Sequence, residues 1–413
     1  MKNSISSESI YNNYFWLLSL SAVIAIFTGK YVLSTVFFPL VIFIRAYSVG
    51  SIKIKHFVDV IYILLITSII LSWAINQFEN KSTIILLYIL SNGAFMSAYF
   101  IGRDQSRENV YAIFEYSLLP ITVVNILGIA LYFIQPDWYV DITNKNQFVE
   151  GLEAARLRSI FSSPYVCSYS SFFAILYILL VKKKKQHFSN NISQTKKTYS
   201  VSTKIVNLCL ITSFLALILC MQRCPIGGAI LAIVAFSIIS INKNNYHKMI
   251  AIYAISLVIL IITLHLLLQQ MDLDSTDFLY EKFEILFDKE DNFFEERRDL
   301  FTIEESTFGD GAGRHAHFAM KFWNRCISDN EYGKLEQETG TVGFVLQLSI
   351  IVVSLIKSLL NWKNLTFELC VLIFLLFSMS GADPLSFYEL HSFFYWFVIG
   401  VVVSYKKVKF KHE

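Results

Sequence analysis

The chain has 413 residues, of which 55% are hydrophobic and 16% are charged, with 35 Lys and Arg against 32 Asp and Glu. A soluble domain carries about a quarter of charged residues and arranges its apolar residues in short periodic stripes. Here apolar runs of about 17–25 residues recur, which is the length that crosses a bilayer as a helix. The composition excludes an ordinary soluble globular protein and predicts an all-α, polytopic integral membrane protein.

The hydropathy pattern predicts about 12 transmembrane helices in chain order. They cover residues 14–29, 32–49, 57–76, 82–101, 111–134, 164–181, 204–221, 226–241, 249–268, 341–357, 365–381 and 391–405. The first apolar run follows a single Lys and lacks a small-residue cleavage site, so we expect it to be a retained helix.

Lys and Arg in the short loops predict the orientation. The basic segments are residues 51–56, 102–107, 182–204, 242–248, 357–364 and the tail 406–413. All of them fall on one side if both termini are cytoplasmic, which places two long loops, 135–163 and 269–340, on the opposite side. The chain then divides into helices 1–134, loop 135–163, helices 164–268, loop 269–340, and helices with a cytoplasmic tail at 341–413.

The larger loop carries aromatic residues and leucines at three- and four-residue spacing. This spacing predicts amphipathic helices that lie against the membrane face.

The positive-inside rule disfavours arginines on the outer side, so those that are present there are expected to have a function. Fixed guanidinium groups suit a diphosphate, because each offers a planar fork of donors that stays charged. The alternative is that they reach lipid headgroups or pair with loop carboxylates. The functional interpretation is favoured for the two that border spans, whereas both interpretations stay open for the other four. The two are Arg156 and Arg223, and the four are Arg158, Arg297, Arg298 and Arg314.

The segment GDGAGRHAH at 309–317 places Gly309, Gly311 and Gly313 within five residues. This predicts a tight turn with exposed N–H groups that suit an anion. It does not follow a strand and open a helix, so no dinucleotide or P-loop site is predicted. His315 and His317 form an HxH pair without a third ligand at suitable spacing, and we therefore predict no metal and no cofactor.

The segment ISDNEYGKLEQETGTVGF at 327–344 is polar until Thr341 and then turns apolar. Its carboxylates are Asp329, Glu331, Glu336 and Glu338. A carboxylate in a partly dry site can act as a general base if its pKa is raised. For Glu338 the structural alternative is a helix cap ahead of the tenth span, where the helix dipole favours negative charge.

Three patches together resemble the O-antigen polymerase (Wzy) family, within the O-antigen ligase and polymerase superfamily of GT-C-like membrane glycosyltransferases. They are RLRSIFSSPY at 156–165, with Pro164 before a span, MQRCPIGG at 221–228, and the stretch from FGDGAG at 308–313 through DNEYGKLEQETGTVG at 329–343. The last patch matches the ligase pattern at Asn330, Tyr332, Glu338, Gly340 and Gly343. It departs at Asp329, where the ligases have His.

The resemblance implies an inverting, metal-independent glycan transfer at the periplasmic face of the bacterial inner membrane. A growing chain on undecaprenyl diphosphate would pass to the non-reducing end of a second lipid-linked repeat unit. The expected partners are this lipid-linked donor and acceptor, the lipid bilayer and a chain-length regulator, with no nucleic acid.

The resemblance also implies roles for individual residues. Asp329 is the leading general base with Glu338 as its rival, while Asn330, Tyr332, His315 and His317 would lie at the acceptor. The diphosphate would be bound by Arg156, Arg223 and one of Arg297, Arg298 and Arg314.

Two alternatives remain. The first is an O-antigen ligase, which attaches finished polymer to lipid A-core; Asp329 in place of His favours the polymerase over it. The second is a lipid-linked oligosaccharide flippase or other transporter, which needs charged residues buried mid-span that face a central cavity. The sequence leads us to expect spans that are nearly free of such charges.

Overall fold

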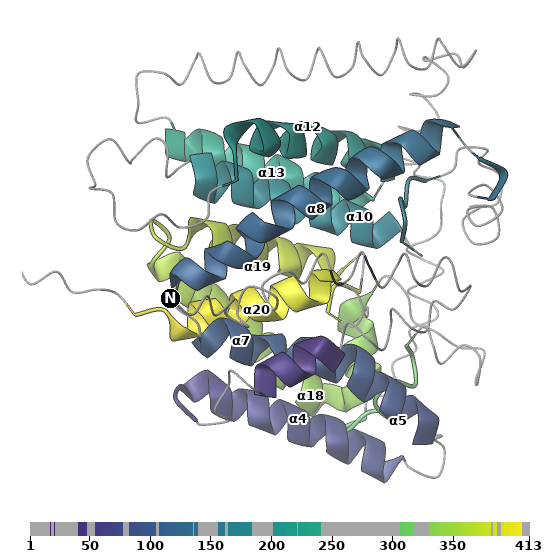
Figure 1. Ribbon diagram of the computed structural model, residues 1–413. Helices are drawn as coiled ribbons and strands as arrows, with labels where there is room; N and C mark the ends of the chain where they lie inside the picture. Colours follow the sequence, from purple (N-terminus) through teal and green to yellow (C-terminus); the bar gives the residue numbers. More distant parts are fainter. Residues whose placement is uncertain are drawn as a thin grey trace, which may run out of the picture. The chain divides into compact units, whose positions relative to one another are not determined.

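The computed structural model is all-helical in the residues it describes (Figure 1). These are residues 17, 20, 40–47, 54–76, 82–104, 107–134, 136–138, 156–161, 164–183, 201–220, 222–240, 306–316, 330–380, 383–385 and 390–406. The expected span 249–268 lies outside them, as do nearly all of 14–29 and half of 32–49. Most of the two predicted long loops also lies outside.

Helices occupy the described part of each remaining expected span. Their bounds are α4 Phe57–Ile75, α5 Ser82–Tyr88, π-helix η1 Ile89–Gly93, α6 Ala94–Met96, α7 Ala98–Asp104, α8 Arg107–Ile134, α10 Pro164–Tyr177, π-helix η2 Ile178–Lys183, α12 Thr203–Cys220, α13 Arg223–Ser240, α18 Glu331–Leu360, α19 Thr366–Ser378 and α20 Leu390–Ser404. Within the described residues, five helical segments are long and apolar enough to cross a membrane, and three more are apolar but shorter. The helical membrane class is therefore confirmed, while the count of 12 and the sidedness of the loops stay predictions.

Two expected spans differ from the helices observed. The span 82–101 is a series of short pieces, α5, η1, α6 and α7, because a π-helical turn and Ser97 interrupt the regular ladder. The Ser97 hydroxyl donates to the carbonyl of Ala94, which competes with helical pairing. The span 341–357 is the second part of α18, which already begins at Glu331 within the polar segment.

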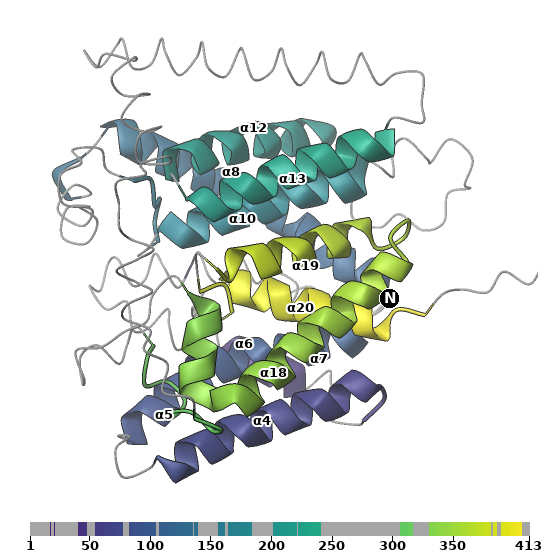
Figure 2. The same ribbon diagram turned by 180° about the vertical axis from the view of Figure 1, so that it is seen from behind.

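The chain forms two compact units that divide within α8. Unit 1 comprises residues 1–117 and 298–413, and contains α4 to α7 and α18 to α20. Unit 2 comprises residues 118–297, and contains α10, α12 and α13, which run side by side in Figures 1 and 2. Each unit is described by itself below.

The described helices bury several charged residues, all of them near the starts of the expected spans or outside those spans. Asp59 in α4, Glu115 in α8 and Glu368 in α19 lie within the first turns of their expected spans, and three further buried charges of α18 precede the expected span 341–357. They are tolerated because partners that are distant in sequence come close in space. Glu368, for example, accepts a hydrogen bond of 2.9 Å from the Tyr111 hydroxyl.

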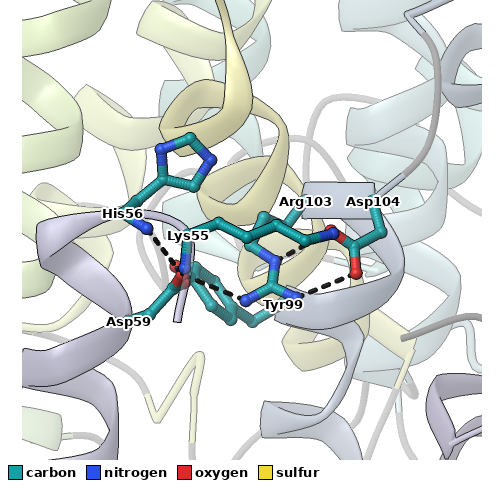
Figure 3. Close-up of polar contacts among 6 residues, drawn as sticks. All are labelled: Lys55, His56, Asp59, Tyr99, Arg103 and Asp104. Carbon is teal, nitrogen blue, oxygen red and sulfur yellow. Dashed lines mark hydrogen bonds and ion pairs between the residues drawn. The ribbon is translucent and has the colours of Figure 1, made fainter. Parts of the chain in front are cut away.

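A polar cluster ties the start of α4 to the end of α7 within unit 1 (Figure 3). Arg103 reaches the Asp59 carboxylate at 3.1 Å and the Asp104 carboxylate at 2.8 Å, and its side chain is 1% exposed. Tyr99 donates a short hydrogen bond to Asp59, and Lys55 pairs with Asp104 at 2.8 Å. Breaking a buried ion pair by removing one partner costs about 3–5 kcal/mol, so this cluster fixes how α4 and α7 pack.

We expect Asp104→Asn to lower the stability of unit 1 at neutral pH by about 1–3 kcal/mol, because three charge-assisted hydrogen bonds, two from Arg103 and one from Lys55, are weakened. Burial opposes ionisation of Asp104, but the hydrogen bonds from Arg103 and Lys55 outweigh it and hold its pKa below the usual value. A folded pKa below the unfolded one means that this stabilisation is present above the unfolded pKa and is lost as the pH falls through the folded pKa. Thermal unfolding of wild type and variant across the acid range measures this. A difference in Tm that stays constant down to the lowest pH contradicts the assignment.

Candidate functional site

The polar segment ahead of the tenth expected span forms a short helix of its own. Although α18 runs from Glu331 to Leu360, its backbone breaks at Gly340, which has φ 68° and ψ −179°. Figure 2 shows the part before the break, Glu331–Thr339, turned across the end of the longer part. We call this part the half-helix. The longer part, Thr341–Leu360, is about 30 Å long and spans a bilayer alone.

The first turns of both parts of α18 find specific acceptors for their N–H groups. The side chain of Asn330 caps its start by accepting from the N–H of Gly333 at 3.1 Å. After the break, the N–H groups of Thr341 and Val342 donate to the carbonyls of Ser306 and Thr307 at 3.2 and 3.4 Å. The first turn of the longer part is thus capped by backbone from another segment, not by Glu338.

That other segment is the glycine loop, Ser306–Ala316, in which Gly309, Gly311 and Gly313 all have positive φ. The expected anion-binding turn is present, and its anion is the carboxylate of Glu338. The N–H of His315 donates to Glu338 Oε1 at 3.0 Å, and the N–H of Gly313 also bonds this carboxylate. Glu338 is 1% exposed, so these bonds fasten the loop to the half-helix.

The end of α4 completes this junction. The Ser72 hydroxyl donates to the carbonyl of Glu338 at 2.5 Å, and the amide of Asn76 donates to the carbonyl of Gly309 at 2.9 Å. The break at Gly340 is therefore held from two sides, by α4 and by the glycine loop.

One face of the half-helix is charged and turned into the protein. Glu331, Lys334 and Glu338 follow at three- and four-residue spacing, and each is at most 1% exposed. Lys334 Nζ lies 3.7 Å from Asp383 Oδ2, and its positive charge also acts on Glu338. The N–H of Leu385 donates to Glu331 at 3.1 Å, so the turn at 383–385 is anchored to the same face.

Asp383 connects this face to the start of α20. Its Oδ1 accepts from the N–H of Asn330 at 3.2 Å, and the ring of His391 hydrogen-bonds to its backbone. Sequence reasoning missed Lys334, Asp383 and His391. The spacing of Glu331, Lys334 and Glu338 is a usable signal for Lys334, whereas nothing local marks Asp383.

Asp310 is the carboxylate of the glycine loop, and it is accessible. Its side chain is 40% exposed, and its Oδ2 lies 3.1 Å from Nε2 of His315, which is 9% exposed. Arg314 extends beside it and donates to the Asp310 carbonyl at 3.4 Å. An Asp–His pair with an arginine thus lies on the outside of the loop that holds Glu338 on its inside.

In unit 2, the two sequence segments that carry the predicted arginines lie next to each other. The N–H of Leu157 donates to the carbonyl of Leu219 at 3.0 Å, and the Cys220 thiol donates to the carbonyl of Leu157 at 2.9 Å. These contacts bring Arg156 and the buried Arg158 to the turn between α12 and α13, where Arg223 begins α13. The nearby Pro164 begins α10, a position that its fixed φ and missing N–H favour.

The other predicted site residues have definite places or lie outside the described part. Tyr332 donates to the carbonyl of Leu376 at 2.8 Å, which holds the half-helix to α19. Gly343 lies against Thr339 and Ser68, where a Cβ would clash. Asp329, His317, Arg297 and Arg298 lie outside the described residues, as does the side chain of Arg223. Their expected roles stay predictions.

The fold and these contacts define a helical membrane protein with a broken helix whose polar end is buried against a glycine-rich loop. No family model, curated protein or solved structure matches the chain.

Proposed function

We propose that this chain is a surface-polysaccharide polymerase that moves a growing glycan from undecaprenyl diphosphate onto the non-reducing end of a lipid-linked repeat unit. One observation carries the proposal: the residues that match the family's motif act together in building one junction. Together they cap the start of α18, anchor it to α19, break it at Gly340 and hold the glycine loop against it. These residues are Asn330, Tyr332, Glu338, Gly340 and Gly343.

The placement of this junction supports the chemistry. The longer part of α18 accounts for the full thickness of a bilayer core, so the half-helix extends beyond that core. A lipid-linked donor presents its diphosphate and first sugar at this depth, because its polyprenyl tail stays in the hydrocarbon. A polar site at the end of a span therefore suits a reaction between two lipid-linked sugars.

Unit 2, taken by itself, carries arginines that suit the second requirement, a stabilised leaving group. Departure of undecaprenyl diphosphate builds negative charge on the leaving oxygen, and fixed guanidinium groups stabilise it without a metal. Arg156 is half-buried beside the α12–α13 turn, in a segment that is itself held by backbone hydrogen bonds. The backbone that carries Arg156 is thus fixed at the α12–α13 turn.

A second candidate is supported by a different feature of α18. Discontinuous helices with charged residues buried near the break also occur in transporters, where they bind substrate or coupling ions. Glu331, Lys334 and Glu338 next to Gly340 fit this pattern. A lipid-linked oligosaccharide transporter is therefore the function against which the polymerase must be tested.

Purified full-length chain in liposomes with a synthetic undecaprenyl-diphosphate repeat unit separates the alternatives. We expect a ladder of extended products on the lipid. In a parallel reaction with preformed lipid-linked polymer and lipid A-core, transfer of the polymer without extension identifies a ligase instead. Movement of the repeat across the bilayer without extension identifies a transporter.

In that assay we expect Arg156→Ala to reduce extension at least 100-fold, because a charge that stabilises the leaving diphosphate is lost. Arg156→Lys keeps the charge but loses the bidentate fork, so we expect an intermediate rate. Lys204→Ala is the matched control, because it removes an exposed cation near the start of α12, the helix whose last residue, Cys220, contacts Leu157. Wild-type extension in Arg156→Ala removes this residue from the mechanism.

A further inference from the structure

The site contains several carboxylates, but most of them cannot meet a substrate. Glu331, Glu338 and Asp383 are 0%, 1% and 4% exposed, and each carboxylate accepts hydrogen bonds from backbone N–H groups of neighbouring segments. A carboxylate used in this way has its lone pairs directed at the protein. These three therefore act as structural anchors of the junction.

Asp310 differs from them in accessibility and in its partner. Its side chain is 40% exposed, and its Oδ2 lies 3.1 Å from the His315 ring. Its backbone is fixed, because its N–H donates to the carbonyl of Gln337 at 2.7 Å. The carboxylate is thus positioned by the half-helix while it still faces outward.

The position of His315 is equally well determined. Its N–H is the donor to Glu338 Oε1 at 3.0 Å, and its ring is the partner of Asp310 Oδ2. The buried anchor Glu338 and the accessible Asp310 are therefore connected through one residue. Loss of the anchor would displace the accessible carboxylate.

Resting on the proposed function, we infer that Asp310 is the general base of the transfer, with His315 as its positioning residue, in place of Asp329, which the sequence suggested and which lies outside the described residues. Asp310 takes the proton of the acceptor hydroxyl, and the acceptor oxygen forms the new bond to the anomeric carbon of the donor sugar. The bond from that carbon to the phosphate oxygen breaks, and its electron pair leaves with undecaprenyl diphosphate. Atoms and charge balance without a metal or a redox partner.

Arg314 gives this loop a cation next to the base. Its guanidinium donates to the Asp310 carbonyl at 3.4 Å, so the loop carries a proton acceptor and a positive charge together. This pairing suits a reaction in which a hydroxyl loses a proton while a phosphate oxygen gains negative charge.

The test uses the purified full chain, the synthetic undecaprenyl-diphosphate repeat unit and single-step extension kinetics. We expect Asp310→Asn to lower kcat by about 100-fold or more, with KM changed little, because general-base catalysis contributes about 10²–10⁴-fold. Glu336→Gln is the matched control, since Glu336 is a partly exposed carboxylate on the half-helix, and we expect it to stay within about twofold of wild type.

A pH–rate profile separates the base from a merely structural residue. Within the described residues, the charged and titratable groups around Asp310 include His315 and Arg314 on its own loop, and Glu338 on the half-helix, which His315 contacts. We expect the acid limb of the wild-type profile to be absent from the residual activity of Asp310→Asn, and Asp310→Glu to restore part of the rate. His315→Gln should lower kcat less than Asp310→Asn does.

The outcomes distinguish a failure of the base assignment from a failure of the proposed function. Wild-type kcat in Asp310→Asn, or an acid limb that persists in this variant, overturns the base assignment while the polymerase stands. A wild-type chain that never extends the repeat overturns the polymerase and the base assignment together. A variant that unfolds is recognised by its Tm, and Asp310→Glu then decides the assignment: an unchanged profile contradicts it, and a shifted acid limb supports it.

Discussion

Gly340→Ala is expected to separate the glycine loop from the half-helix and to abolish extension of the lipid-linked repeat. Gly340 has φ 68° and ψ −179°, a backbone region that is essentially restricted to glycine. A Cβ at this position would also lie 2.5 Å from the backbone nitrogens of Phe308 and Gly309. Strain and overpacking each cost about 1–3 kcal/mol, so we expect a loss of about 3 kcal/mol or more.

Hydrogen exchange of the purified chain measures this effect locally. Peptides that cover the glycine loop and the half-helix should exchange faster in Gly340→Ala, whereas peptides from α20 should be unchanged. Gly93→Ala is the control, because a Cβ there meets its nearest neighbour, Ile89 Cγ2, at an ordinary 3.8 Å. Unchanged protection of the loop in Gly340→Ala would show that the break does not hold it.

Gly102→Ala and Gly400→Ala are expected to be the most destabilising substitutions outside the site. Gly102 of α7 and Gly400 of α20 lie where the two helices cross, and each faces the backbone of the other helix. A Cβ on Gly102 would meet the Phe397 carbonyl, and a Cβ on Gly400 would meet the Tyr99 carbonyl. The atoms in the way are backbone, so side-chain rotation cannot relieve the overlap. The helices must move apart, which disturbs Tyr99 and Arg103 of the polar cluster as well.

We expect each single variant to lose about 3 kcal/mol, which lowers Tm by roughly 6–12 °C. The double variant should lose less than the sum, because the first substitution already separates the helices at the shared crossing. Thermal unfolding of wild type, the two single variants and the double variant in one detergent measures this double-mutant cycle. Strict additivity, or a Tm near that of wild type, would contradict so close a crossing.

The helices could be predicted because each depends on a continuous stretch of chain. A run of about 20 apolar residues is helical in a bilayer whatever its neighbours are, since its backbone groups must pair within the segment. The expected spans at 57–76, 111–134 and 204–221 therefore agree closely with α4, α8 and α12. The span 82–101 agreed less well, because Ser97 and a π-helical turn interrupt it without lowering its hydropathy.

The site could be predicted only in part. Its glycines and the motif residues around Glu338 were visible in the sequence, because turns and caps depend on residues a few positions apart. The partner of Glu338 was not, since His315 lies 23 residues away in the chain. The roles expected for Asp329, Arg297 and Arg298 concern residues outside the described part and stay predictions.

The amino-acid sequence by itself determined that this is a helical membrane protein, and it located a polar segment at the start of one span. Hydropathy and short-range spacing carry that information without any tertiary contact. Only the tertiary structure decided that Glu338 is an anchor and that Asp310 is accessible. Burial and backbone hydrogen bonds distinguish Glu338 from Asp310, and both depend on segments that fold together from distant parts of the chain.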